Sequence, residues 1–593
     1  MPATTTRPRS AKSAPVQPYR IALADVRRRG AILMIVTAVV LSLFAGRLIE
    51  LQAVRGDALA SAALDQRLRT VELPAERGSI VDARGEPLAI TVEARHLTAD
   101  QTLIENPAEV AAALAPILGQ DVVTIQQRLT GDRRFIYVAK NMTPETWRRI
   151  QALQLPGILS EEAARRVYPG GPVAANVVGF VGADGKALGG LEYALDDVLS
   201  GEVGTRTFER GPGGRAIPTA VSSGTEAKPG ATVHLTINRD IQHVAQQAIA
   251  DQVQASRSDS GTVVVMNPKT GDILAMATAP TFDANDPGAA DAANRGNRAL
   301  TEIFEPGSTG KVMTIAAVVD QGKATPYTQI TVPGKLPRAG KDFKDHTPHG
   351  TLQMTMAGIM AKSSNIGTIL AAERIGGKRL HRYLKRFGVG EPTGLNFPGE
   401  SNGFVPAHRD WSATSLPTIA FGQGLSMNAV QATNVFATIA NDGVRLNPRL
   451  ISGYTQADGS METAPIAAGT PVVSPNTAQQ VRAMIETVVR DGGTGTSAAI
   501  PGYRVGGKTG TAQYIDPIRG GYGRGVMASF IGMAPLDAPE LVVGVFLVNP
   551  RIGRYGGELG GPVFKRVMTY ALQAERIPPT GTKAGKLPLF AGQ

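Results

Sequence analysis

The sequence has no cysteine and few histidines, which removes several kinds of chemistry at once. Without cysteine the chain can form neither a disulfide nor a thiolate nucleophile, and cysteine usage gives no indication of the redox compartment. None of the 7 histidines has the spacing of an HExxH site, so we expect no metal. The chain is basic, but its positive charge is concentrated before an apolar segment and no nucleic-acid-binding motif is present, so we expect no nucleic-acid partner.

Positive charge is concentrated at the N-terminus. Residues 1–29 contain seven Lys or Arg residues against a single acidic residue, Asp25, and so hold over half of the net charge of +11. The following segment, residues 31–45 (AILMIVTAVVLSLFA), contains no charged residue. A basic flank before an apolar segment predicts a membrane span with its N-terminus inside. We therefore expect a cytoplasmic basic tail over 1–29 and one transmembrane helix over 30–50.

A cleaved signal peptide is the alternative interpretation of this region. The basic region is long for a signal peptide, and Arg47 and Glu50 continue an amphipathic helix beyond the apolar segment. The nearest small-x-small cleavage pattern, Ala58-Leu59-Ala60, lies beyond several charged residues. These features favour a membrane anchor.

Turn-forming residues divide the rest of the chain. Residues 209–230 are rich in Gly, Pro and Ser, which predicts a domain boundary near residue 228. Before this boundary, residues 72–91 predict a hairpin and residues 104–165 predict mostly helix; after it, strands flanked by helices indicate an α+β domain. The expected domains are residues 51–228 and 229–578, followed by a C-terminal tail over 579–593.

Ser308 and Lys311 are the first candidate catalytic residues, in FEPGSTGKVMT (residues 304–314). The apolar pattern that follows predicts a helix, on which positions i and i+3 share a face. A lysine can remove the proton of a serine hydroxyl if burial or a nearby cation brings its pKa from about 10.4 toward ~7–8. Serine is also a common N-cap, so the pattern alone leaves both interpretations open.

Two later motifs complete a possible site. Ser363-Ser364-Asn365 offers a hydroxyl that could relay protons from Lys311 and an amide that could hold a substrate carbonyl. Lys508-Thr509-Gly510-Thr511 lies in a segment that could form an edge strand beside a substrate backbone. Lys508 could keep Lys311 neutral and could meet a substrate carboxylate.

The chain contains a second Lys-Thr-Gly, at residues 269–271. It precedes Ser308 and lies between two predicted strands, so we interpret it as a hairpin turn. The order S-x-x-K, S-x-N, K-T-G is typical of penicillin-binding proteins and serine β-lactamases. A Ser-His-Asp site is disfavoured, because no G-x-S-x-G surrounds Ser308.

The chain resembles a class B penicillin-binding protein of the cell-division transpeptidase type (FtsI, penicillin-binding protein 3), over about residues 27–570. The catalytic motifs occur as FEPGSTGK, KSSNIG and GKTGTAQ, in the expected order. ERGSIVDARGEPLA, GGLEYALDDVLSG, FGQGLSMNAVQ and GRYGGELGGPVFKRV also resemble segments of that family.

The resemblance implies an α+β protein with an N-terminal membrane anchor, an elongated, non-catalytic, dimerisation-type pedestal domain and a transpeptidase domain. The last contains an antiparallel five-stranded sheet sandwiched by helices. The implied roles are nucleophile for Ser308, base for Lys311, proton shuttle for Ser363, donor-peptide binding for Asn365, electrostatics for Lys508, and contact with the substrate carboxylate for Thr509, Gly510 and Thr511. The backbone N–H groups of Ser308 and Thr511 form the implied oxyanion hole.

The implied reaction is D,D-transpeptidation of peptidoglycan stem peptides during septal cell-wall synthesis, through a serine acyl-enzyme and without a metal or cofactor. β-Lactams would acylate the same serine. The implied partners are lipid-linked stem-peptide precursors, an FtsW-type glycosyltransferase and other division proteins. The implied location is the cytoplasmic membrane, with the catalytic domain outside.

Three alternatives remain at the level of the sequence. FGQG and Gln513 also suit an elongation-type enzyme (penicillin-binding protein 2), although Glu305 before Pro-Gly-Ser favours the division type. A β-lactamase would not need residues 51–228. A non-catalytic scaffold or β-lactam sensor could retain the fold, but the intact Ser308, Lys311, Ser363 and Lys508 argue against an inactive site.

Overall fold

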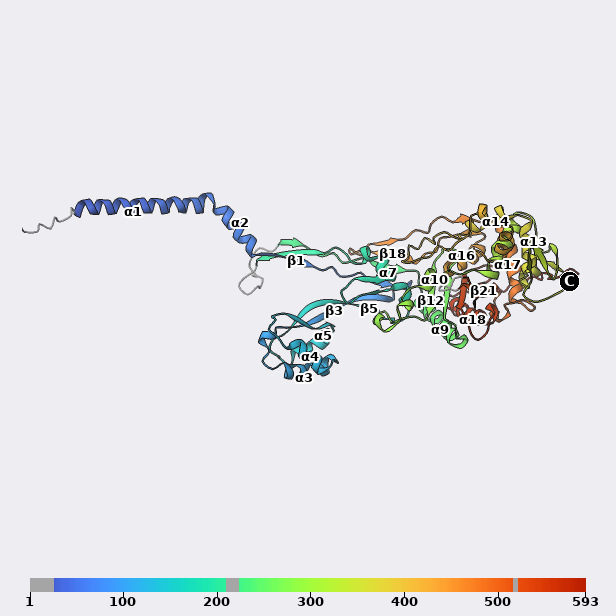
Figure 1. The fold of residues 1–593 in the computed structure, drawn as a ribbon, viewed down its shortest axis with the longest axis horizontal. Helices are drawn as coiled ribbons and strands as arrows, with labels where there is room; N and C mark the ends of the chain where they lie inside the picture. The colour runs from blue at the N-terminus through green and yellow to red at the C-terminus, as the bar shows by residue number, and fades with distance from the viewer. Residues whose placement is uncertain (1–25, 210–222, 516–520, 593) are drawn as a thin grey trace, which may run out of the picture. The chain divides into compact units, whose positions relative to one another are not determined.

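The computed structural model describes residues 26–209, 223–515 and 521–592 (Figure 1). The chain forms two compact units, Met1–Leu73 with Gly204–Glu226 and Pro74–Val203 with Ala227–Gln593. The catalytic motifs all lie in the second unit.

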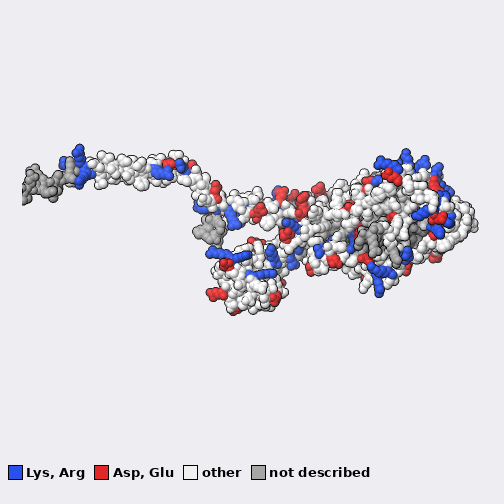
Figure 2. All heavy atoms as spheres, viewed as in Figure 1, with Lys and Arg blue, Asp and Glu red and all other residues white. Residues whose placement is uncertain are grey.

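The first unit contains a long apolar helix and a small sheet. Its elements are α1 (Val26–Ile49), the π-helix η1 (Glu50–Val54), α2 (Gly56–Arg67), β1 (Leu68–Leu73), β8 (Gly204–Glu209) and β9 (Ser223–Thr225), with the strands in the order β1-β8-β9. The helix over Val26–Val54 contains an 18-residue window with a mean hydropathy of 2.4 and is long enough to cross a membrane. Figure 2 shows basic side chains at both ends of α1 and an uncharged middle. These features are consistent with the predicted single-pass anchor.

The second unit begins with the residues expected to form the pedestal. Their elements are β2 (Ile80–Val81), β3 (Pro87–Ala99), α3 (Pro107–Leu118), α4 (Val122–Leu129), β4 (Ile136–Met142), α5 (Pro144–Gln151), β5 (Ile158–Val167), α6 (Ala175–Val178), β6 (Phe180–Val181), β7 (Ala187–Gly189), α7 (Gly190–Ala194) and α8 (Asp196–Leu199). The predicted hairpin over 72–91 is confirmed, because β2 pairs antiparallel with β3.

The prediction of mostly helix over residues 104–165 is wrong in part. Helices α3, α4 and α5 are present, but β4 and β5 both pair with β3. The sequence of β5, ILSEEAARRV, favours helix by local propensity. Its ten-residue ladder with β3 satisfies the backbone instead, so tertiary pairing overrides the local preference.

One mixed sheet joins residues on both sides of the predicted boundary near residue 228. Strand β10 (Thr232–Leu235) pairs in parallel with β2 and antiparallel with β18 (Ile451–Thr455), which in turn pairs with β19 (Met461–Thr463). Strands from before and after the predicted boundary therefore belong to one hydrogen-bonded sheet.

A five-stranded antiparallel sheet forms the centre of the catalytic region, as the resemblance implied. Its strands are β12 (Ile273–Ala279), β11 (Ser260–Met266), β23 (Leu541–Val548), β22 (Tyr522–Ala534) and β21 (Gly506–Ile515), in that order across the sheet. All eight residues of β23 are buried, as expected for a central strand covered on both faces. Strand β21 lies at an edge, which confirms the predicted edge strand around residues 505–513.

Helices cover both faces of this sheet. Those that contact its strands are α9 (Arg239–Ser256), α10 (Arg298–Thr301), α16 (Ala429–Ala440), α17 (Pro475–Val489) and α18 (Gly556–Ala574). The region also contains α11 (Lys311–Asp320), α12 (Met356–Ala361), α13 (Asn365–Glu373), α14 (Gly377–Arg386) and α15 (Ser415–Ala420). Short strands accompany them: β13 (Gln329–Val332), β14 (Leu336–Arg338), β15 (Lys341–Phe343), β16 (Leu352–Thr355), β17 (Val444–Arg445) and β20 (Thr470–Pro471).

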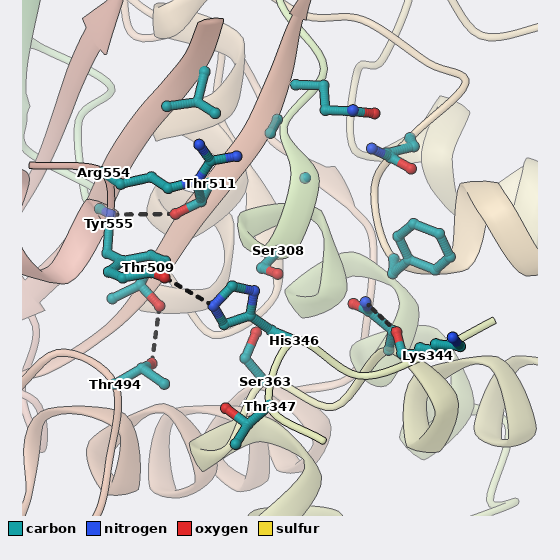
Figure 3. A pocket seen from close by; sticks show the side chains of 18 of the residues that line it. Ser308, Lys344, His346, Thr347, Ser363, Thr494, Thr509, Thr511, Arg554 and Tyr555 are labelled. Carbon is teal, nitrogen blue, oxygen red and sulfur yellow. Dashed lines mark hydrogen bonds between the residues drawn. The ribbon is translucent and has the colours of Figure 1, made fainter. Parts of the chain in front are cut away.

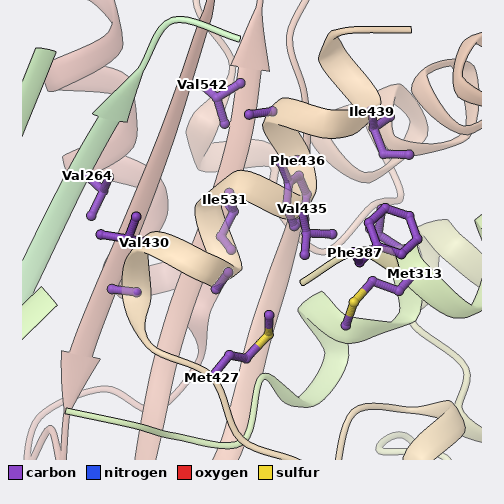
Figure 4. Packing of buried hydrophobic residues seen from close by; sticks show 14 of the residues in the cluster. Val264, Met313, Phe387, Met427, Val430, Val435, Phe436, Ile439, Ile531 and Val542 are labelled. Carbon is purple, nitrogen blue, oxygen red and sulfur yellow. The ribbon is translucent and has the colours of Figure 1, made fainter. Parts of the chain in front are cut away.

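Alternation along β11 assigns its side chains to two separate cores. Val263 and Val265 pack in the core that contains α9 and α18, whereas Val264 belongs to the larger core on the other face. In that larger core, Val430 and Phe436 of α16 pack near Ile531 and Val542 of the sheet (Figure 4). Because side chains alternate between faces along a strand, each central strand contributes to both cores and holds the helices in fixed positions.

The C-terminal segment packs on the helix that leads to Ser363. The backbone N–H of Thr355 donates to Leu589 O (3.1 Å), and the Thr355 hydroxyl donates to Pro588 O (2.6 Å). Thr355 is the N-cap of α12, and α12 ends two residues before Ser363. The segment expected as a tail over 579–593 therefore contacts the catalytic region within its described part.

Candidate active site

Ser308 lies in a tight turn that leads into α11. The turn is the 3-10 helix η6 (Gly307–Gly310), whose N-cap is Pro306 and has no side-chain capping bond. Side chains three residues apart eclipse one another in a 3-10 helix, so the turn brings Ser308 and Lys311 to the same side. Ser308 is half-buried, and no described residue forms a hydrogen bond with its hydroxyl. It is therefore not the N-cap that the sequence left as an alternative.

Lys311 is completely buried at the start of α11. Its Nζ donates to Asn365 Oδ1 (2.7 Å), to Ser363 Oγ (3.2 Å) and to the backbone oxygen of Ser363. Burial lowers the pKa of Lys311 to about 7, although the charge of Asp345 acts in the opposite direction. Burial disfavours the ammonium form, so a substantial fraction of Lys311 is a neutral amine near neutral pH.

Ser363 occupies a turn between two helices rather than a position within one. It follows the end of α12 and precedes α13, and its φ of 56° lies in the left-handed region. The next residue, Ser364, caps α13 by accepting from Gly367 N (2.8 Å). This turn directs the Ser363 hydroxyl and the Asn365 amide toward Lys311.

Lys508 approaches Ser363 from the edge strand β21. Its Nζ donates to Ser363 Oγ (2.9 Å) and to Thr509 O (3.2 Å). Burial lowers the pKa of Lys508 well below its usual value, and the charge of Lys311 lowers it further. The side chain has no exposed surface, and its amine faces Ser363 and Thr509 inside the protein rather than the open pocket.

Ser363 Oγ thus accepts from two buried amines. Two like charges in a buried site repel, so the site favours a state in which the two lysines together carry fewer than two protons. With Lys311 neutral and Lys508 still donating, the Ser363 hydroxyl can pass a proton toward Lys311 or receive one from it. The geometry therefore fits a proton relay.

The rest of the Lys-Thr-Gly-Thr motif forms one wall of the site. Thr509 Oγ1 lies 2.8 Å from Thr494 Oγ1, and Thr511 Oγ1 accepts from Gly556 N (3.3 Å). A Cβ on Gly510 would collide with Ser529 Oγ and lie 3.0 Å from Thr309 Cγ2. Glycine at 510 therefore allows β21 to approach the turn that carries Ser308.

These residues line a single open pocket of about 790 Å³ (Figure 3). Ser308, Ser363, Asn365, Thr509 and Thr511 all contribute to its surface. Lys311 and Lys508 lie behind it, where they contact Ser363 without reaching solvent. Figure 3 also shows the His346 ring between Ser308 and Ser363, with its Nε2 3.1 Å from the hydroxyl of Tyr555.

Asp345 is a site residue that the sequence reasoning missed. Its Oδ2 accepts from the Ser364 hydroxyl (2.5 Å) and lies 3.0 Å from His349 Nε2, and its Oδ1 accepts from Ile366 N (2.9 Å). Asp345 thereby fixes the start of α13 and places a negative charge near Lys311. No sequence pattern indicated it, because residues 341–350 match none of the motifs.

Glu305 is a second supporting residue. Its Oε1 accepts from Gly424 N (2.8 Å) and from the Tyr522 hydroxyl (2.9 Å), which links the Ser308 turn to the FGQG segment and to β22. Burial raises the pKa of Glu305, although both hydrogen bonds act to lower it. The sequence drew attention to Glu305 and FGQG only through the family resemblance.

The second Lys-Thr-Gly lies away from this pocket. It forms the turn between β11 and β12, where Lys269 N donates to Asn267 Oδ1 (2.8 Å) and Gly271 has a φ of 77°. The predicted hairpin turn at residues 269–271 is confirmed.

Two family models match the chain. Residues 261–569 match the penicillin binding protein transpeptidase domain, and residues 72–235 match the penicillin-binding protein dimerisation domain. The first match includes all the candidate site residues, and the second includes the strands β2 to β5 and β10.

Whole-length relatives agree with these domain matches. The penicillin-binding protein PbpB of Mycobacterium tuberculosis is 37% identical over 593 residues, covering 94% of this chain and 87% of the relative. The peptidoglycan D,D-transpeptidase FtsI of Escherichia coli is 31% identical over 554 residues, covering 92% of this chain and 91% of the relative.

A solved structure has the same fold. The crystal structure of penicillin binding protein 3 from Mycobacterium tuberculosis, complexed with aztreonam, superposes with a TM-score of 0.70 and 34% identity, covering 88% of this chain and all of that one. The chain therefore belongs to the class B penicillin-binding proteins, as a serine-type transpeptidase of the cell-division group.

Proposed function

We propose that this protein cross-links peptidoglycan stem peptides, with Ser308 as the acylated nucleophile and Lys311 as its base. The observation that carries the proposal is the burial of Lys311, whose pKa is about 7, in hydrogen-bond contact with Ser363 beside the pocket that holds Ser308. A base with a pKa near the working pH combines a large neutral fraction with useful basicity.

In the first step, Ser308 Oγ attacks the carbonyl carbon of the D-Ala-D-Ala peptide bond, and its proton passes to Lys311. The backbone N–H groups of Ser308 and Thr511 stabilise the oxyanion of the tetrahedral intermediate. The carbon–nitrogen bond then breaks, and the departing D-Ala amine takes a proton from Lys311 through the Ser363 hydroxyl. The product is an ester between Ser308 and the donor stem peptide.

In the second step, an amine of a neighbouring stem peptide attacks this ester. Its proton passes to Lys311, the ester bond breaks, and Ser308 Oγ recovers a proton. Asn365 holds the donor peptide, while Lys508 sustains the relay through Ser363. Thr509, Gly510 and Thr511 form the edge-strand surface for the substrate backbone and carboxylate. A β-lactam enters at the first step and leaves a slowly hydrolysed ester.

The anchor and the pedestal place this chemistry in the cell envelope. We assign residues 1–29 to a cytoplasmic tail, 30–50 to the span of the cytoplasmic membrane, 51–228 to the pedestal and 229–578 to the catalytic domain outside the membrane. The basic residues before α1 support this orientation. In this arrangement the span and pedestal are the surfaces for an FtsW-type glycosyltransferase and other proteins of septal synthesis.

The test is labelling of the full-length, detergent-solubilised protein with a fluorescent penicillin, followed by intact-mass and peptide mass spectrometry. We expect one adduct at Ser308 that persists over hours, and none in Ser308→Ala with an unchanged melting temperature. An adduct that disappears within minutes would favour a β-lactamase. Failure of folded protein to form any adduct would overturn the catalytic assignment.

A further inference from the structure

Because Lys508 is buried, the carboxylate of the substrate in the proposed reaction has no cation to bind it at that position. On the proposed function, the donor peptide ends in a carboxylate, and penicillins carry one too. Lys508 has no exposed surface, and its amine donates to Ser363 Oγ and Thr509 O inside the protein. A carboxylate entering along β21 therefore needs a cation from elsewhere in the pocket.

Among the residues that the structure describes, four other cations line the pocket, and three of them are engaged or distant from β21. Lys362 Nζ donates to Gly492 O (2.7 Å), and Lys341 Nζ lies over the ring of Phe343, 5.4 Å from its centroid. Lys344 lies on the opposite wall, where its backbone oxygen accepts from Asn365 Nδ2 (3.0 Å). The fourth cation is Arg554.

Arg554 lies on the wall formed by the Lys-Thr-Gly-Thr strand. Two residues after it, Gly556 N donates to Thr511 Oγ1 (3.3 Å), which ties this segment to β21. Figure 3 shows the Arg554 side chain reaching into the pocket on the side of Thr511. The accepted hydrogen bond orients the Thr511 hydroxyl so that its own proton can be donated to a ligand.

The Arg554 guanidinium is exposed and available. Within the described ranges it forms no ion pair or side-chain hydrogen bond; its backbone N–H donates to Glu558 Oε2 (3.3 Å). A guanidinium matches a carboxylate with two parallel N–H···O bonds, which a lysine amine cannot reproduce.

We propose that Arg554 binds the terminal carboxylate of the donor stem peptide, together with the hydroxyls of Thr509 and Thr511, and that Lys508 acts only on the proton relay. The equivalent carboxylate of a penicillin binds in the same place. Arg554 is then a substrate-binding residue that determines selectivity for a free carboxylate.

The experiment compares acylation by a penicillin and by its carboxylate methyl ester, measured as second-order rate constants on the full-length protein in detergent. Wild type is expected to prefer the free acid. Arg554→Gln should lower the rate constant for the acid about tenfold and leave that for the ester unchanged, while Arg554→Lys should recover part of the loss. High salt should reduce the preference of wild type for the free acid over the ester, because the ion pair between Arg554 and the carboxylate is partly exposed to solvent.

The control is Lys341→Gln, which removes one positive charge from the pocket lining, where Lys341 lies over the ring of Phe343, and should leave the acid-to-ester ratio at the wild-type value. Equal losses for acid and ester in Arg554→Gln, or no loss for either, would overturn the proposal. If wild type is acylated at Ser308 by both compounds, the proposed function holds and such a result contradicts only the role of Arg554.

Discussion

The two Lys-Thr-Gly tripeptides place identical residues in opposite surroundings. Lys269 is exposed in the turn between β11 and β12, and Thr270 Oγ1 accepts from Asp272 N (3.2 Å). Lys508 is completely buried in the edge strand β21 and contacts Ser363. The first tripeptide closes a hairpin, and the second contributes to a polar site.

The difference shows that burial, and not the tripeptide itself, gives a lysine unusual chemistry. Packed neighbours exclude water from the Lys508 side chain, and this desolvation lowers the pKa of Lys508 well below its usual value. Substitutions at matched positions of the two tripeptides can test this explanation, because the three residues are the same while their backbone conformation and surroundings differ.

The largest expected contrast is between Lys508→Met and Lys269→Met. Lys508→Met removes the donor to Ser363, so we expect acylation by penicillin to fall at least about a hundredfold. Its melting temperature should stay the same or rise, because an apolar side chain replaces a buried amine. Lys269→Met should stay within twofold of wild type. Rate constants from fluorescent labelling, with melting curves, provide the measurement, and equal losses at the two positions would contradict the comparison.

Alanine substitutions at Gly510 and Gly271 should change different properties, the first the rate of acylation and the second the stability of the fold. A Cβ at Gly510 would push on Ser529 and Thr309 beside the nucleophile turn, so Gly510→Ala should slow acylation roughly tenfold to a hundredfold. A Cβ at Gly271 would lie 2.5 Å from Asn447 O at a φ of +77°. Gly271→Ala should lower the free energy of unfolding by about 1–3 kcal/mol and leave acylation of the folded protein unchanged. The explanation fails if Gly271→Ala is the slower enzyme.

The pH dependence of acylation should follow the protonation of the buried Lys311. Lys311 acts as a base only when neutral, so the rate should rise with pH through about 7, the pKa of Lys311. The charge of Asp345 raises that pKa, so its removal in Asp345→Asn should move the midpoint to lower pH. Lys269→Met is the control and should leave the profile in place. A profile that falls with pH across this range would contradict Lys311 as the base.

The smallest effects are expected from substitutions of the residues that support each Lys-Thr-Gly through a hydrogen bond. Asn267→Ala removes the acceptor for Lys269 N and should lower the free energy of unfolding by about 1 kcal/mol without changing the acylation rate. Its counterpart is Thr494→Val, which removes the partner of Thr509 Oγ1 and should slow acylation several-fold. Denaturant titration and labelling rates together distinguish the two results.

Strong local signals accounted for the parts of the fold that were predicted correctly. The charge-free segment lies within α1, the run of three valines became part of β11, and the turn at residues 269–271 formed between the two predicted strands. The helical prediction failed at β5, whose Glu, Ala and Arg residues prefer helix locally but pair with β3. The left-handed turn that holds Ser363 between α12 and α13 leaves no pattern in the sequence.

The sequence by itself determined the order of Ser308, Lys311, Ser363 and Lys508, the basic flank before an apolar span, and the family that these motifs resemble. Tertiary structure decided that Asp345 and Glu305 support the site, that Ser363 lies in a turn between two helices, and that Lys508 lies out of reach of solvent. A motif specifies which groups are available. Their pKa values and contacts depend on desolvation by segments far apart in the chain, and only the packed fold supplies that environment.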